Sequence, residues 1–176
     1  MAYVTDMTKR PVEMLLGLIN ADNNLGLVES DVEILAPQTQ AADAEGRNTN
    51  VQIDLEVLPS EVQDDFVTFE YERIDLAALF GDIAPEFREV DVPLNENGVP
   101  ADSAVFWPEV QRKFGVAMND ADFEYALKSA GIITISAKAG NLAYIGSFDI
   151  AVQSSLETRV ATTVLNGFEA PAAPAE

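Results

Sequence analysis

Apolar and polar residues alternate strictly from Thr49 to Val57, which is the clearest pattern in the chain. Every second residue of this run is apolar or β-branched: Thr49, Val51, Ile53, Leu55 and Val57. Such alternation predicts a β-strand with one buried face and one solvated face. A second strand is expected over residues 66–73, with Val67, Phe69 and Tyr71 on one side. The two strands are expected to form a hairpin or meander.

Apolar residues at helical spacing mark other segments. The segment from Pro11 to Asn20 begins with a proline suited to a first helical turn and carries one apolar face: Val12, Leu15, Leu16 and Ile19. A short helical turn is expected over residues 75–81 and a helix over 108–114. A further helix is expected over 120–130, with Asp120 as its N-cap and Gly131 just past its end.

The remaining segments favour strands and loops. Strands are expected over residues 31–35, 87–94, 132–138 and 142–152, the last two joined by a tight turn at Gly140-Asn141. Residues 38–48 are polar and predict an exposed loop. The Thr- and Val-rich stretch 156–165 favours a strand, although the spacing of Leu156, Val160 and Val164 also fits a helix.

These elements predict the fold class. We expect a compact α+β domain over residues 1–168, mainly antiparallel β-sheet with three or four short helices. Residues 169–176, EAPAAPAE, form an Ala/Pro-rich tail that has no side chains able to build a core.

The amino-acid composition argues against nucleic-acid binding and against several kinds of catalysis. The chain has 30 acidic and 10 basic residues, a formal net charge of −20, and neither histidine nor cysteine. Binding to nucleic-acid phosphates relies on clustered Lys and Arg, so direct nucleic-acid binding is not expected. Catalysis by histidine or by a thiolate is excluded, as is most zinc chemistry. No apolar run approaches the roughly 20 residues of a membrane span.

Two acidic runs partly resemble metal-binding motifs. Asn20-x-Asp22-x-Asn24 begins like a calcium loop, but its glycine and its twelfth residue, Asp31, do not fit that motif, and a helix-ending turn explains it better. The run Asp120-x-Asp122-x-Glu124 is interpreted as helix capping. Four aromatic residues are expected in the core: Phe66, Phe69, Tyr71 and Trp107. No cofactor and no metal is predicted.

Three motifs, in order and spacing, carry a resemblance that covers most of residues 10–125. They are LLGLINADNNLGL, GRNTNVQIDLEVLP and VTFEYERIDLAALF, and a later KFGV turn is also similar. Together they resemble a family of small virion structural proteins of large tailed bacteriophages. The resemblance implies a particle component, made in the host cytoplasm and located in the virion. Its implied partners are other virion proteins and copies of itself.

Two of these motifs contain residues with an expected structural role. Asn48 and Thr49 lie where a polar loop becomes a strand, so their side chains are expected to satisfy backbone groups there. Arg73 lies near Asp75 and two glutamates and is expected to bridge the strand end to a loop through carboxylates. We therefore interpret four residues as structural, with side chains that hold strand ends and loops in place: Asn48, Thr49, Arg73 and Asp75. A ligand-binding role is the alternative.

The sequence therefore predicts a non-enzymatic structural subunit of a tailed-bacteriophage virion, in the tail, neck, baseplate or head decoration. An acidic surface suits a conduit that DNA slides past and suits an outward-facing protein equally well. The alternative is an acidic DNA-mimic decoy that inhibits a host nucleic-acid-binding protein. A carboxylate-based hydrolase of cell-wall polysaccharide is a third possibility.

Overall fold

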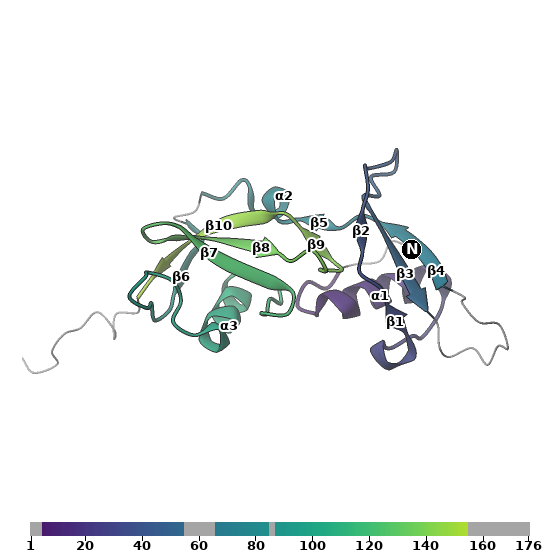
Figure 1. Cartoon of the computed structure of the whole chain (residues 1–176), viewed down its shortest axis with the longest axis horizontal. Coiled ribbons are helices and arrows are strands. Elements are labelled where there is room, and N and C mark those ends of the chain that lie inside the picture. Colours follow the sequence, from purple (N-terminus) through teal and green to yellow (C-terminus); the bar gives the residue numbers. More distant parts are fainter. Residues whose placement is uncertain (1–4, 55–65, 85–86, 155–176) are drawn as a thin grey trace, which may run out of the picture.

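The computed structural model describes residues 5–54, 66–84 and 87–154, which form two lobes (Figure 1). The predicted α+β class is confirmed, since three α-helices accompany three mainly antiparallel sheets in the described residues. The strand expected over 156–165 and the tail 169–176 lie outside the described residues. Because part of 1–168 also lies outside them, the single-domain assignment stays a prediction.

The smaller lobe packs one helix on a four-stranded sheet. It contains α1 (Pro11–Asn23), a 3-10 turn (Glu29–Asp31), β1 (Glu33–Ile34), β2 (Gln38–Thr39), β3 (Thr49–Asp54) and β4 (Phe66–Tyr71). β3 lies in the centre, with β1 and β2 on one side and β4 on the other, all antiparallel to it. The core between helix and sheet consists of Leu15, Ile19, Val51, Ile53 and Tyr71.

Most predictions for this lobe are confirmed. α1 begins at Pro11 as expected and ends where Asn24 adopts a left-handed conformation (φ 54°). The alternation from Thr49 gives β3, whose odd-numbered residues are buried; Leu55 and Val57 lie outside the described residues. The core prediction for Phe66 is wrong, because this side chain is 40% exposed. Phe66 opens an edge strand, and its alternation with Tyr71 directs it away from α1.

The larger lobe is a second two-layer unit. It contains α2 (Leu76–Phe80), β6 (Glu89–Asp91), α3 (Ser103–Phe114), β7 (Phe123–Ser129), β8 (Ile132–Ala137) and β10 (Ser147–Gln153). The sheet order is β6-β10-β8-β7, and only β6 and β10 run parallel. Aromatic side chains fill the space between the helices and one sheet face; Phe80 stacks on Phe148 at 4.2 Å, and Phe106 lies 4.8 Å from Tyr125.

The helix predicted over 120–130 is wrong, because Phe123–Ser129 forms strand β7. β7 pairs with β8 in an antiparallel hairpin, with Tyr125 opposite Ile135. Gly131, expected to end a helix, instead turns the hairpin at φ 75°. Backbone pairing with β8 therefore overrides the helical spacing of the apolar residues, and Leu127, expected on a buried helical face, is 46% exposed.

Two further expectations need correction. The helix expected over 108–114 begins earlier, at Ser103, because the Asp102 side chain accepts a hydrogen bond from Ala104 N (2.8 Å) and caps it. The expected strands around Gly140-Asn141 do pair, as β8 and β10, but β10 begins only at Ser147. Asn141 is buried and organises a longer connection rather than a tight turn.

A two-stranded parallel sheet joins the lobes. β5 (Ile74–Asp75) follows the smaller lobe's last strand, and β9 (Tyr144–Ile145) lies in the connection between β8 and β10. The Ile74 amide also donates to the Ala143 carbonyl (2.9 Å). Met14 of α1 belongs to the larger lobe's core, so the lobes share apolar contacts as well.

Candidate functional site

Arg73 lies in the junction between the lobes and is 3% exposed. Its Nε donates to Thr49 Oγ1 (2.8 Å) and its Nη2 donates to Thr39 Oγ1 (2.5 Å), both in the smaller lobe. Its Nη1 donates to the Asn141 carbonyl (3.0 Å), in the connection that belongs to the larger lobe. One guanidinium therefore ties the end of β2 and the start of β3 to the other half of the molecule.

The structure brings three of the four predicted site residues together. Asn48 Oδ1 accepts hydrogen bonds from the Arg73 backbone amide (3.0 Å) and from Thr49 Oγ1 (2.8 Å). Asp75 lies apart from this group: its Oδ1 accepts from Ala77 N (2.9 Å) and caps α2.

The expected carboxylate partners of Arg73 are absent. Within the described residues Arg73 forms no ion pair, and its guanidinium binds hydroxyl and carbonyl oxygens. Ion pairs with carboxylates are formed instead by Arg10, Arg47 and Arg112. Neutral acceptors satisfy the geometry of a buried guanidinium without a compensating charge.

Burial governs the electrostatics of the junction. It lowers the pKa of Arg73 and raises the pKa of Tyr71 to about 12. The Tyr71 hydroxyl donates to the Leu142 carbonyl (2.7 Å), which is a second tie between the lobes. At neutral pH Arg73 is therefore a cation and Tyr71 is neutral, so neither is poised to exchange a proton.

Sequence reasoning missed Asn141 as a site residue. Its side chain is 1% exposed; Oδ1 accepts from the amides of Ala143 (3.0 Å) and Tyr144 (2.9 Å), and Nδ2 donates to the Asp122 carbonyl (3.0 Å). These bonds shape the connection that receives Arg73. The Gly140-Asn141 pair does indicate a turn, but it predicts a tight hairpin turn where the structure has a longer connection.

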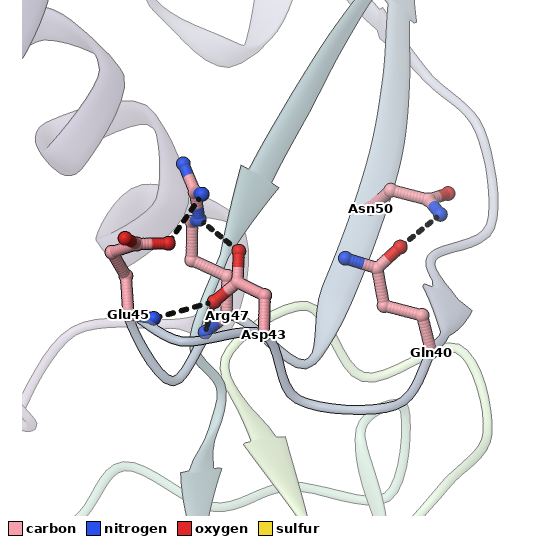
Figure 2. Close-up of polar contacts among 5 residues, drawn as sticks. All are labelled: Gln40, Asp43, Glu45, Arg47 and Asn50. Atoms are coloured by element: carbon pink, nitrogen blue, oxygen red, sulfur yellow. Dashed lines mark hydrogen bonds and ion pairs between the residues drawn. The ribbon is translucent and has the colours of Figure 1, made fainter.

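The loop between β2 and β3 projects from the smaller lobe (Figure 1) and is held by its own side chains (Figure 2). Asp43 accepts from the Glu45 and Arg47 amides (3.0 and 2.9 Å) and from Arg47 Nε (2.6 Å). Arg47 also pairs with Glu45 (2.9 Å). At the base, Asn50 Nδ2 donates to Gln40 Oε1 (3.1 Å). The tip is therefore preorganised, and little entropy would be lost if it contacted a partner.

Side chains of the two acidic runs form hydrogen bonds within the fold. No group of three potential ligands is arranged for a metal ion within the described part of the chain. Asn20 Oδ1 accepts from Leu27 N (2.8 Å), and its Nδ2 donates to Leu27 O (2.8 Å), which closes the turn after α1. Asp120 does not cap a helix at its own position; it accepts from Trp107 Nε1 (2.8 Å) and Ser103 Oγ of α3.

Acid titration should report the Asp120 contact through Trp107, the chain's single tryptophan. Hydrogen bonds from Ser103 and Trp107 lower the pKa of Asp120 below its usual 3.8. The contact therefore stabilises the fold above the unfolded-state pKa, and this contribution is lost as pH falls through the lower folded-state value. We expect the Trp107 fluorescence transition to have its midpoint below pH 3.8 and to vanish in Asp120→Asn. A midpoint at or above pH 3.8 would contradict the assignment.

A hollow of about 380 Å³ lies beside the junction, between α1 and the end of β4. Its walls are mainly apolar, with Leu15 and Leu18 on the helix and Leu142 from the connection. Two carboxylate residues, Asp22 and Glu72, also line it, and none of its lining residues within the described ranges is basic. No helix in the described residues has the length and apolarity to cross a membrane.

A model of a family of unknown function (DUF7941) matches residues 5–176. The chain belongs to this family. No curated protein and no solved structure matches it. The region matched by the family model therefore includes both lobes and the junction between them.

Proposed function

We propose that this member of DUF7941 is a non-enzymatic structural subunit of a tailed-bacteriophage virion and acts through protein–protein contacts. The observation that carries the proposal is the placement of the motif residues. Asn48 and Thr49 of one motif and Tyr71 and Arg73 of the next meet at the junction, where they hold two lobes together. A structural subunit must keep a fixed shape, and these hydrogen bonds support the arrangement of the two lobes.

The use of basic side chains supports the same proposal. Arg10, Arg47, Arg112 and Lys128 pair with neighbouring carboxylates. Arg73 donates to oxygens inside the protein. The 30 acidic residues outnumber the 10 basic residues and give a net charge of −20, so the outer surface is strongly acidic. Such a surface suits a subunit that packaged DNA passes without sticking, or one that faces solvent at high local concentration.

Exposed apolar side chains provide places for protein contacts. Phe87 is 74% exposed, Val28 is 54% exposed, and Phe66 and Val67 of β4 are each 40% exposed. Single exposed apolar residues are common, but Phe66 and Val67 expose one apolar side chain on each face of β4, which pairs only with β3 among the described strands. The proposed partners are therefore other virion proteins and copies of this chain, and the proposed role requires no cofactor.

The same acidic surface also favours a second candidate, a DNA-mimic decoy that occupies a basic site on a host protein. The two functions differ in stoichiometry and salt dependence. A decoy binds one basic partner with an affinity that falls steeply as salt rises, because exposed charges are screened.

Quantitative mass spectrometry of purified phage particles tests the proposal. We expect this chain at a fixed copy number that survives washing in high salt. Its absence from particles, together with salt-sensitive capture of one basic host protein, would replace the structural function with the decoy function. Cross-linking of intact particles before digestion would then assign its place to the tail, neck, baseplate or head.

A further inference from the structure

The outer edge of β4 offers unpaired backbone groups. Among the described residues, β3 is the only strand that pairs with β4. Leu35 N donates to Gln52 O (3.0 Å), so the backbone groups of Gln52 face β1. Successive residues of a strand direct these groups to opposite sides, so Val51 and Ile53 face β4. Their partners Phe69 and Val67 therefore face β3.

It follows that Phe66, Thr68 and Glu70 direct their backbone N–H and C=O groups outward. Soluble proteins usually protect such an edge with lysine, proline or a bulge. The β4 sequence FVTFEY has no lysine and no proline, and its six residues pair with β3 without a register shift. In the part of the chain that the structure describes, no other strand pairs with this edge, so it can accept an added strand.

The hollow beside the junction lies along the same edge. α1 contributes Met14, Leu15, Leu18 and Asp22 to its wall, and the end of β4 contributes Tyr71 and Glu72. A strand added to β4 would lie over this side of α1, because Val67, Phe69 and Tyr71 direct their side chains there. The apolar wall fits an aliphatic side chain, and the exposed carboxylates of Asp22 and Glu72 attract a cation.

We propose that β4 and this hollow bind an extended basic segment of a partner protein. The segment adds a strand to β4 and places a lysine or arginine in the hollow, with its aliphatic stem against Leu18 and its charge beside Asp22 and Glu72. A second copy of this chain is the poorer occupant, because copies of charge −20 repel each other and β4 supplies no basic side chain. The inference rests on the proposed function in naming another particle protein as the partner.

A peptide probe tests the strand addition with the full chain. The probe is a fluorescent octapeptide of alternating valine and lysine with blocked ends, and its binding is followed by anisotropy at about 0.15 M salt. The control peptide has the same side chains but N-methylated central amides, which cannot form a ladder. We expect the control to bind at least roughly tenfold more weakly. Equal binding of both peptides would show attraction by charge alone and overturn the proposal.

Two protein variants locate the site. Thr68→Pro removes an outward N–H but leaves the bonds of Val67 and Phe69 to β3, so the fold should persist. Thr68→Val keeps the N–H and is the matched control. We expect Thr68→Pro, but not Thr68→Val, to lower the affinity for the unmodified peptide by roughly tenfold. If Thr68→Pro unfolds, Asp22→Lys combined with Glu72→Lys replaces it, and unchanged binding by that double variant would overturn the proposal.

Other occupants give different results. A dimer in sedimentation that Thr68→Pro dissociates would assign the edge to a second copy and overturn the partner assignment. Peptide binding that appears only after deletion of residues 2–4 or 169–176 would assign it to the chain itself, with the same consequence. Particle copy number is measured separately: peptide binding by a chain absent from virions removes only the proposed function, whereas a virion subunit that ignores the peptide removes only this inference.

Discussion

Arg73→Ala should lower the free energy of unfolding by roughly 2–4 kcal/mol. The substitution leaves the buried Asn141 carbonyl without its donor, at a cost of about 1–3 kcal/mol, and also removes the guanidinium hydrogen bonds to Thr49 and Thr39. Urea denaturation of the variant and the unchanged chain measures the difference. The matched control is Arg112→Ala, which removes an arginine that is 70% exposed and should leave the midpoint almost unchanged.

The same variant should uncouple the lobes. Trp107 lies in the larger lobe's core, so its fluorescence reports that lobe, whereas far-ultraviolet circular dichroism reports both. We expect the two signals to coincide in the unchanged chain and to separate in Arg73→Ala. Arg73→Lys should also be destabilised, because an ammonium lacks the planar fork that reaches three segments. Coincident transitions with an unchanged midpoint in Arg73→Ala would show that the guanidinium does not hold the junction.

Local patterns predicted the smaller lobe well. The alternation from Thr49 and the apolar face predicted over Pro11–Asn20 both depend on a period that is visible within a few residues, although α1 extends to Asn23. The same method failed at β7, because Phe123, Ala126 and Leu127 fit a helical face and their strand pairing depends on β8. Tertiary partners decide such ambiguous segments.

The junction could be predicted only in part. Asn48, Thr49 and Arg73 stood out through their motifs, and the structure places them in one hydrogen-bonded group. The partner that completes the group, the Asn141 carbonyl, lies 68 residues from Arg73 in the sequence. A backbone carbonyl has no sequence signature, whereas the carboxylates near Arg73 in the sequence do, and for this reason the sequence predicts the wrong partners.

Phe106→Ala should cost about 3–5 kcal/mol, the range for removing a fully buried phenylalanine. Phe106 is 0% exposed, and its ring lies 4.8 Å from those of both Trp107 and Tyr125, so the cavity would open at the centre of the aromatic core. Phe87→Ala removes the same side chain from a position that is 74% exposed, which makes it the matched control. We expect thermal and urea midpoints to fall for Phe106→Ala and to stay nearly constant for Phe87→Ala. Equal losses in the two variants would mean that the packing of α3 against the larger sheet is assigned wrongly, since Phe106 is buried and Phe87 is exposed.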